Sequence, residues 1–279
     1  MNIPFPSVYK FSSLNINSLS ALAEGKAWFS KLTDFNDPFE GQFIITPPDL
    51  SNNESRERFF NYQAKKLPSN VLSLPAIDLV RKRYYDSPKN YDNFMKDITK
   101  KLRDSIYSRF LDVGAYCLAS DESNEHSPQI CNTMLWSHYA DGMKGFCIKF
   151  NPNKLLASLN KLNKERFYWS KVDYQNKMCS VDYYSADNLS RNETVNVIQT
   201  KHINWAYEYE LRIFTETSGL YKYSFDSIDG IYLGGKMPVS HQKILVDICK
   251  VNLPNIMIYG VKTHKEGYIV EVGEYISSI

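Results

Sequence analysis

Residues 205–214 read Trp-Ala-Tyr-Glu-Tyr-Glu-Leu-Arg-Ile-Phe, and this segment decides how the rest of the chain is interpreted. Side chains of a β-strand alternate between its two faces. One face of such a strand would carry aromatic and aliphatic residues: Tyr207, Tyr209, Leu211 and Ile213. The opposite face would carry Glu208, Glu210 and Arg212, spaced about 7 Å apart because a strand rises about 3.3 Å per residue. We therefore predict a strand with two carboxylates and a guanidinium group in a row.

This charged face has two interpretations. In the first, the side chains form a surface ladder that pairs with Lys or Arg on the neighbouring strand. In the second, they are catalytic: one carboxylate stabilises a developing positive charge, and the other is a base whose pKa is raised by its like-charged neighbour. Arg212 then either binds a phosphate through two hydrogen bonds or restrains one carboxylate. Because Glu208 and Glu210 share a face, each is a candidate for the essential residue.

The composition is that of a soluble globular protein. The chain has 279 residues, of which 43% are hydrophobic and 23% charged, and the net charge of +2 gives no general affinity for nucleic acid, although a local basic groove stays open. The five cysteines are odd in number and form no CxxC pair, which indicates a reduced, cytoplasmic compartment. No signal peptide and no apolar run of about 20 residues is present, so we expect no membrane partner.

The order of patterns predicts an α+β fold with a mixed, largely antiparallel sheet. In residues 91–111, large apolar side chains recur every four residues, as in an amphipathic helix: Phe94, Ile98, Leu102, Ile106 and Phe110. Similar patterns over 55–66 and 77–85 predict a helical insertion at about 54–112. Short aromatic strands precede and follow it, so we predict a single α+β domain over 1–279.

Two further groups of polar residues are candidates for a site. His138 is either a hydrogen-bonded core histidine or, with Tyr139, part of a cleft in which the tyrosine stacks on a planar ring. Asn36, Asp37 and Glu40 either fix a turn through hydrogen bonds from side chain to backbone or form a substrate-contacting loop.

A metal site would combine His138 and Asp141 with Glu40 or Glu210. The sequence contains no HExxH or comparable spacing of ligands, so we expect no bound metal. A metal-dependent nuclease is accordingly the third functional hypothesis, after the two described below.

Three sequence segments together resemble an uncharacterised bacterial family known only as a domain of unknown function. The first segment is WFS at 28–30 followed by FNDPFE at 35–40. The second is LWSHYADGMKGFCIKF at 135–150, which is the most specific of the three. The third contains Lys201 and the pattern WxYExExR at 205–212, followed by IYLG at 231–234. These segments span nearly the whole chain.

The layout of the chain also resembles that of ADP-ribosyltransferases of the DNA-modifying toxin type. In that superfamily a first strand carries a His or Arg that holds NAD, a second strand carries a Ser element, and a late strand carries the catalytic Glu. The resemblance places Tyr9 or Lys10 at the first position, Ser30 at the second, and Glu210 or Glu208 at the third. The chain departs from the pattern on its first strand, which contains neither His nor Arg.

This second resemblance implies an NAD-dependent ADP-ribosyltransferase-like enzyme, with NAD as co-substrate. The acceptor would be nucleic acid or protein, and the protein would be a toxin or a phage-defence effector, with a cognate antitoxin among its expected partners. His138, Tyr139 and Arg212 would then help to bind NAD or another nucleotide. The competing hypothesis is a non-catalytic module that binds a nucleotide or another protein in the same Tyr-rich cleft.

Overall fold

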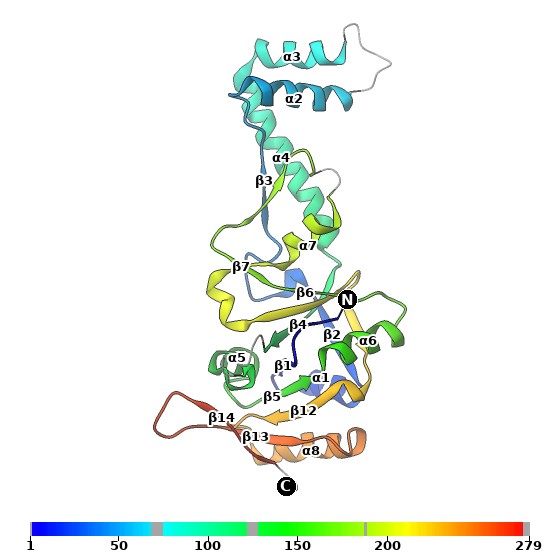
Figure 1. The fold of residues 1–279 in the computed structure, drawn as a ribbon, viewed down its shortest axis with the longest axis vertical. Helices are drawn as coiled ribbons and strands as arrows, with labels where there is room; N and C mark the ends of the chain where they lie inside the picture. The colour runs from blue at the N-terminus through cyan, green and yellow to red at the C-terminus, as the bar shows by residue number, and fades with distance from the viewer. Residues whose placement is uncertain (1, 68–74, 122–127, 187–188, 276–279) are drawn as a thin grey trace. The chain divides into compact units, whose positions relative to one another are not determined.

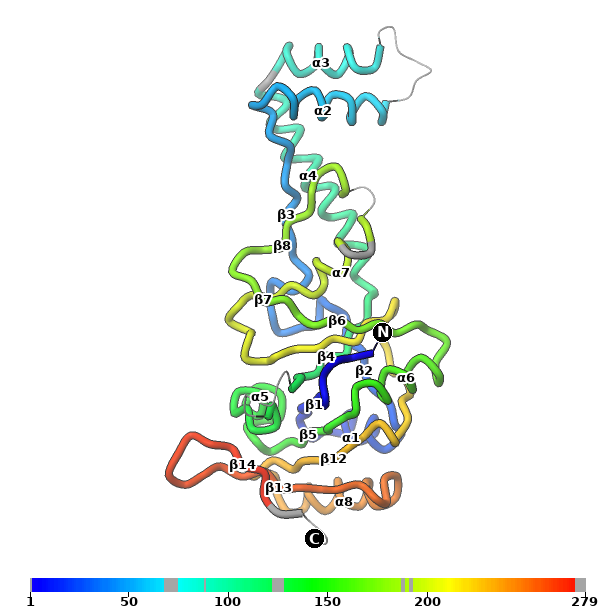
Figure 2. Tube along the Cα trace, viewed as in Figure 1, coloured from blue at the N-terminus to red at the C-terminus, as the bar shows by residue number. Residues whose placement is uncertain are grey.

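A computed structural model describes residues 2–67, 75–121, 128–186 and 189–275 (Figures 1 and 2). The chain divides into two compact units. The first comprises Met1–Glu40, Asp112–Asn176 and Lys201–Ile279, and the second comprises Gly41–Leu111 and Lys177–Thr200. Each unit is described on its own below.

The first unit contains most of the strands. Its strands are β1 (Val8–Ser12), β2 (Lys26–Lys31), β4 (Gly114–Ser120), β5 (Phe146–Phe150), β6 (Tyr168–Lys171), β7 (Asp173–Gln175), β9 (Thr200–His202), β10 (Glu210–Thr215), β11 (Gly219–Lys222), β12 (Ile228–Leu233), β13 (Ile258–Thr263) and β14 (Val270–Tyr275). Its α-helices are α1 (Ile16–Ala23), α5 (Thr133–Tyr139), α6 (Pro152–Leu162) and α8 (Val239–Asn252). Short 3₁₀ turns are η1 (Leu32–Asp34), η2 (Gln129–Cys131), η3 (Ile203–Glu208) and η4 (Phe225–Ser227).

Of the described strands of this unit, β7 and β9 form a separate pair, and the others form one large sheet in the order β11-β2-β4-β1-β5-β12-β13-β14, in which β10 pairs with β4 and β6. All pairs within the large sheet are antiparallel except β12 with β13, which is parallel. The parallel pair is joined through α8, which lies alongside β13 in Figure 1. The mixed, largely antiparallel α+β fold predicted from the sequence is confirmed.

The sheet divides at β4. One edge of β4 pairs with β10 along the length of the strand. The other edge is shared, because Ala115 pairs with Ser30 of β2 while Ala119 pairs with Tyr9 of β1. Between these two pairings β1 and β2 separate, and the carbonyl oxygen of Cys117 accepts a hydrogen bond from a side chain instead of a strand. The division leaves a hollow in the middle of the sheet.

The segment 205–214 adopts two conformations. The predicted strand is confirmed for residues 210–214, which belong to β10, and is wrong for 205–209. Residues up to Glu208 form the 3₁₀ turn η3, and Tyr209 then takes a left-handed conformation with φ of 44°. The side chain of Asn132 supports this turn by donating to the Tyr207 carbonyl over 2.7 Å. Alternation of side chains along the chain cannot reveal such a contact with a distant residue.

Within β10 the predicted alternation holds. Leu211 and Ile213 are fully buried and belong to the main hydrophobic core, together with Phe29 of β2. Glu210 and Arg212 lie on the opposite face and are also buried. Because both edges of β10 are paired, by β4 and β6, the strand is a rigid base for these two charged groups.

The second unit is mostly helical. It contains α2 (Asn53–Lys65), α3 (Ala76–Asp86), α4 (Pro88–Phe110) and α7 (Arg191–Gln199), with a parallel pair of short strands, β3 (Phe43–Thr46) and β8 (Cys179–Asp182). Figure 2 shows α2 and α3 side by side. The helices predicted over 55–66, 77–85 and 91–111 are confirmed, with boundaries within a few residues. Among the described residues, no helix is both long and apolar enough to cross a membrane.

Candidate functional site

A cavity of about 180 Å³ opens where the sheet of the first unit divides. It is lined by residues of β1, β2, β4, β9, β10 and α5 and by neighbouring turns. The lining includes most of the residues singled out from the sequence: Tyr9, Lys10, Ser30, Asn36, Tyr139, Glu208 and Glu210. Segments far apart in the chain therefore meet around one space.

A second, larger hollow of about 590 Å³ adjoins this cavity. The two share Lys10, Phe11, Ser30 and Tyr139 in their walls. The larger hollow continues along β2 and α1, where Trp28 is 53% exposed. Lys10 therefore lies at the boundary of the cavity and the larger hollow, which we call the adjoining groove.

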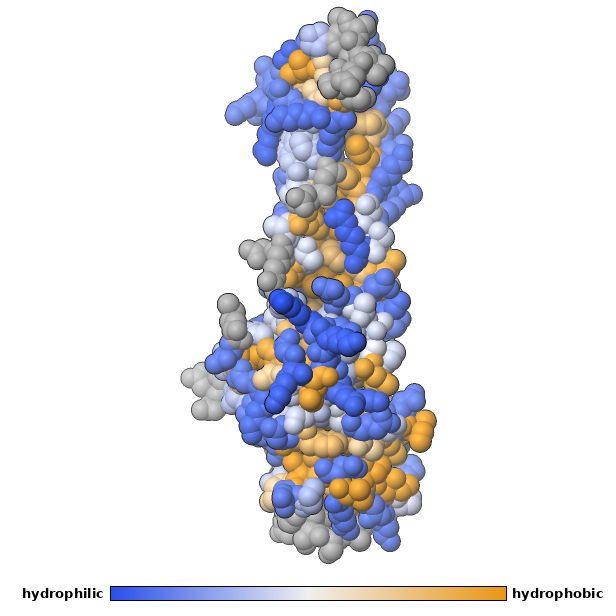
Figure 3. Space-filling model, turned by 90° about the vertical axis from the view of Figure 1, so that its right-hand side faces the viewer, coloured by the Kyte–Doolittle hydropathy of each residue, from blue (hydrophilic) through white to orange (hydrophobic). Residues whose placement is uncertain are grey.

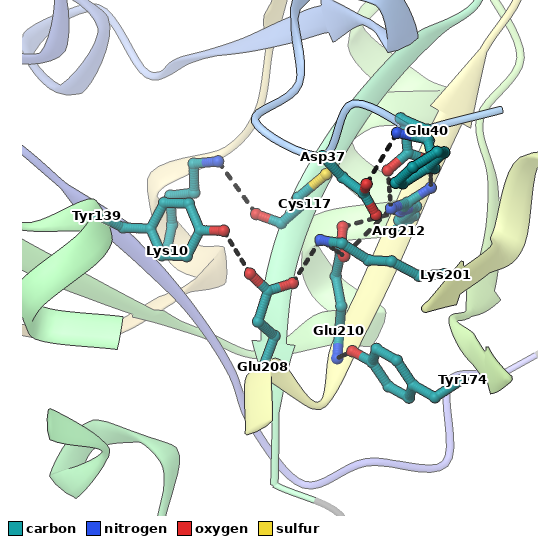
Figure 4. A network of polar contacts seen from close by, with 11 residues as sticks. Lys10, Asp37, Glu40, Cys117, Tyr139, Tyr174, Lys201, Glu208, Glu210 and Arg212 are labelled. Carbon is teal, nitrogen blue, oxygen red and sulfur yellow. Dashed lines mark hydrogen bonds and ion pairs between the residues drawn. The ribbon is translucent and has the colours of Figure 1, made fainter. Parts of the chain in front are cut away.

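One ammonium group joins the two carboxylates of the cavity. Nζ of Lys201, on β9, donates to Oε2 of Glu208 over 2.6 Å and to Oε2 of Glu210 over 3.2 Å (Figure 4). All three side chains are more than nine-tenths buried. The surface ladder considered from the sequence is therefore wrong, because these charges are paired inside the protein.

Arg212 lies behind the cavity and restrains two carboxylates. Its guanidinium group is fully buried, and Nε donates to Oε1 of Glu210 over 2.8 Å. Its two terminal nitrogens reach both oxygens of Glu40 at 2.5 and 2.8 Å (Figure 4). Of the two roles left open for Arg212, the structure shows restraint of a carboxylate, since Arg212 is buried and outside the cavity lining.

The turn before β3 delivers Glu40 to Arg212. The Asp37 carboxylate accepts a hydrogen bond from the Phe39 amide over 2.9 Å, and the Asp37 carbonyl accepts one from the Glu40 amide over 3.1 Å. Asp37 thus fixes the turn, which was one of its two predicted roles, and Glu40 has an ion-pairing role instead. Asn36 alone of the three is exposed and lines the cavity.

The pKa values of the two cavity carboxyl groups move in opposite directions. Burial raises the pKa of Glu208, the attraction of Lys201 offsets part of this, and repulsion by Glu210 adds to it, so the net shift is upward. Burial also raises the pKa of Glu210, but Arg212 and Lys201 outweigh it and hold this pKa well below its usual range. Glu210 therefore stays ionised, while Glu208 keeps its proton to a higher pH than an ordinary glutamate does.

Three further side chains line the cavity around this pair. The Tyr139 hydroxyl donates to Oε1 of Glu208, so it contacts the carboxylate that can be protonated (Figure 4). Lys10 donates to the Cys117 carbonyl over 3.1 Å, and burial lowers the pKa of Lys10. Tyr9 directs its hydroxyl to Oδ2 of Asp121 over 2.9 Å, and burial raises the pKa of this phenol.

His138 is not where the sequence placed it. It is exposed, so the core-histidine interpretation is wrong, and it is outside the lining of the cavity. Its ring lies 6.1 Å from that of Tyr207, centroid to centroid. Helix α5 has only two turns, and its buried face is occupied by Leu135 and Trp136, which leaves His138 facing outward. Among the described residues, no three His, Cys, Asp or Glu side chains converge as a metal site requires.

Two contributors to the site were missed from the sequence. Lys201 was noted as part of a sequence signature but not as a site residue, although it is the cation that joins both carboxylates. Tyr174 of β7 accepts a hydrogen bond from the Glu210 amide over 2.9 Å. Lys201 precedes Glu208 and Glu210 by only seven and nine residues. Two carboxylates that become buried need a cation nearby, and this requirement could have identified Lys201 as a site residue.

Comparison with known proteins gave a match to a family model for part of the chain. A family model described as protein of unknown function (DUF2971) matches residues 135–213. The predicted resemblance to an uncharacterised domain-of-unknown-function family is confirmed over this stretch, which contains the segments 135–150 and 201–212. Comparisons with curated proteins and with solved structures gave no match. The resemblance to ADP-ribosyltransferases stays a prediction.

Proposed function

We propose that the chain is an NAD-dependent ADP-ribosyltransferase-like enzyme that acts on the bond between nicotinamide and ribose. One observation carries the proposal. Glu208 and Glu210 are held by a single lysine at the wall of a cavity, and their pKa values are shifted in opposite directions. Paired carboxyl groups whose environments separate their pKa values are typical of sites that combine charge stabilisation with acid–base chemistry.

The roles follow from these protonation states. As the C1′–N bond breaks, its electron pair leaves with nicotinamide, and positive charge develops on the ribose. The permanently ionised Glu210 stabilises that charge electrostatically. Glu208 accepts the proton of the attacking acceptor while the lone pair of the acceptor forms the new bond to C1′. The raised pKa makes Glu208 a stronger base than an ordinary carboxylate.

The positions of the remaining candidates support the proposal. The layout resemblance requires a first strand, a serine on a second strand and a glutamate on a late strand to share one substrate. Tyr9, Ser30 and Glu210 all line the same cavity. Binding pockets for small molecules and cofactors have volumes of roughly 300–1,000 Å³. The cavity alone is smaller, so the nicotinamide ribose would occupy it and the rest of the dinucleotide would follow the adjoining groove past Lys10.

The biological setting is part of the same proposal. An enzyme that consumes cytoplasmic NAD and modifies nucleic acid or protein fits a toxin or a phage-defence effector, which would be held in check by a cognate antitoxin.

A second candidate function is a non-catalytic module that binds a nucleotide. It is favoured by the completeness of the ion pairing, since Arg212 is fully engaged with Glu210 and Glu40 and is not free to meet a ligand. A binding module would use the same groove without breaking the nicotinamide bond.

The two functions separate in one experiment. The purified full-length protein is incubated with NAD, with and without added nucleic acid and protein acceptors, and released nicotinamide is quantified by chromatography while NAD binding is measured by calorimetry. If the protein is the proposed enzyme, nicotinamide should be released, and Glu208→Gln should lower the rate of release at least tenfold. Binding without release would support the module, and neither binding nor release would reject both. Lys243→Gln, an exposed position on α8, serves as the matched control.

A further inference from the structure

The positive charge of the chain is concentrated in its helical part. Residues 53–110 contain 13 Lys and Arg against 7 Asp and Glu, a net charge of +6, whereas the whole chain carries +2. The remaining residues therefore carry a net charge of −4. A charge asymmetry of this kind indicates binding to a polyanion. The small net charge of the whole chain conceals this asymmetry. Figure 3 shows mostly hydrophilic side chains over the upper part of the view, which contains α2, α3 and α4.

Four of the six basic residues of α4 form a line along the helix. Lys89, Lys96, Lys100 and Arg103 are spaced by seven, four and three residues, and all are exposed. At 3.6 residues per turn these positions fall within about 60° of one another, and they span about 21 Å along the axis. We call these four residues the basic stripe.

The orientation of the basic stripe is fixed by the packing of α4. The apolar side of this helix is buried through Met95, Ile106 and Phe110. The stripe consequently faces outward and is not available for packing inside the unit.

Most of the charge on the stripe is uncompensated. Arg103 forms only a long, exposed ion pair of 3.4 Å with Asp104, which contributes little. For Lys89, Lys96 and Lys100, the described residues supply no ion-pair partner within 4.0 Å. Long lysine side chains in this state are ready to exchange their counterions for phosphates.

We propose that the basic stripe binds the phosphodiester backbone of a nucleic acid, without reading its sequence. Lysines and one arginine in a row match a regular line of phosphates, and such contacts position a protein without specifying bases. A membrane surface fits less well, because the apolar face that an interfacial helix would insert is already buried. An acidic protein fits less well too, because protein interfaces gain most of their affinity from buried aromatic anchors, and the stripe consists of charged side chains alone. This inference does not depend on the proposed activity.

The test is fluorescence anisotropy of the full-length protein with a labelled 24-nucleotide probe in three forms: duplex DNA, single-stranded DNA and single-stranded RNA. The affinity of at least one form should fall with salt, with a slope in log Kd against log[salt] of about 3–4 for four phosphate contacts. Neutralising the stripe (Lys89→Gln, Lys96→Gln, Lys100→Gln and Arg103→Gln together) should weaken that binding at least 30-fold at low salt and remove most of the slope.

A matched control removes the same charge from helices of the first unit. Lys154→Gln, Lys161→Gln, Lys243→Gln and Lys250→Gln together should leave the affinity within threefold of the wild type, and circular dichroism should show both variants folded. An equal loss of affinity in the two variants would show that net charge alone causes the effect, and it would overturn the proposal. Binding only to vesicles of phosphatidylserine and phosphatidylcholine, with none to any nucleic acid, would also overturn it.

Discussion

Glu208 and Glu210 bind the same ammonium group, that of Lys201, yet only Glu210 also binds a guanidinium group. This difference accounts for the opposite shifts of their pKa values, because both carboxyl groups are buried and only Glu210 has two cations to compensate for it. The site therefore contains one carboxyl group with a fixed charge and one whose charge depends on pH.

Neutralising the two carboxylates one at a time should have unequal effects on stability. Glu210→Gln leaves Arg212 and Lys201 short of a counter-charge inside the protein, and breaking a buried ion pair from one side costs about 3–5 kcal/mol. Glu208→Gln should change the free energy of unfolding by less than about 1 kcal/mol, since the fold already favours the neutral form of this group. Urea unfolding at pH 7 measures both values, and a larger loss for Glu208→Gln would contradict the assignment.

Stability should also depend on pH in a way that reveals Glu208. Its pKa is higher in the folded than in the unfolded protein, so between these two pKa values the folded state binds more protons. The stabilisation from the protonated group is complete below the unfolded value of about 4.3 and is lost as pH rises through the raised folded value. The unfolding free energy of Glu208→Gln relative to the wild type should therefore increase with pH across this window and then level off. A difference that is constant between pH 4 and 8 would show that the pKa is not raised.

The hydroxyl of Tyr139 should tune the proposed base. It donates to Glu208, and this hydrogen bond favours the ionised form. Under the proposed mechanism, the rate of ADP-ribosyl transfer rises with pH as Glu208 loses its proton. Tyr139→Phe should move that rise to higher pH in a pH–rate profile. Tyr174→Phe is the control, because its hydroxyl contacts the Glu210 amide and not a carboxylate, and should leave the midpoint unchanged.

Arg212 and Glu40 should behave as one energetic unit. Arg212→Met leaves buried Glu40 without its cation and Glu210 with Lys201 alone, and we expect a loss of about 3–5 kcal/mol in unfolding free energy. Adding Glu40→Gln to this variant removes one of the stranded charges and should recover part of the loss. The coupling energy from the double-mutant cycle, obtained by urea unfolding, should exceed about 1 kcal/mol. Additive effects would show that the two side chains act independently.

Lys10 should contribute to NAD binding more than to stability. Its pKa is lowered by burial, so the fold tolerates its charge at a cost, and Lys10→Met should leave the unfolding temperature unchanged or raise it. If Lys10 meets a phosphate at the junction of cavity and groove, the same variant should weaken NAD binding by tenfold or more in calorimetry. Lys26→Met, on the wall of the larger hollow and paired with Glu24, gives the comparison. Equal weakening by both variants would argue against a specific role.

Local sequence patterns predicted the helices and strands of this fold well, but they predicted the turns between them poorly. The four-residue period from Phe94 to Phe110 identified α4, and the alternation of Leu211 and Ile213 identified the buried face of β10. The same alternation failed at residues 205–209, because the side chain of Asn132 stabilises a 3₁₀ turn there from 75 residues away.

The sequence named several residues of the cavity wall but not the electrostatics of the site. Sequence resemblance placed Tyr9, Ser30 and Glu210 together, and all three line the cavity. The charged side chains of β10 are buried in ion pairs, and this pairing depends on Glu40, which is 172 residues from Arg212 in the chain. Contacts of that range follow from topology, and no spacing within a single segment records them.

The left-handed backbone at Tyr209 separates the two carboxylates mechanically. Glu210 belongs to a strand with partners on both sides, whereas Glu208 ends a short turn and is held by its side-chain contacts with Lys201 and Tyr139. A ligand that displaces the Tyr139 hydroxyl can therefore reposition Glu208 while the sheet stays still. A tyrosine pays about 1–2 kcal/mol to adopt this conformation, and a glycine would not. Tyr209 is thus a strained residue between one carboxylate that is fixed in the sheet and one that is held by side-chain contacts.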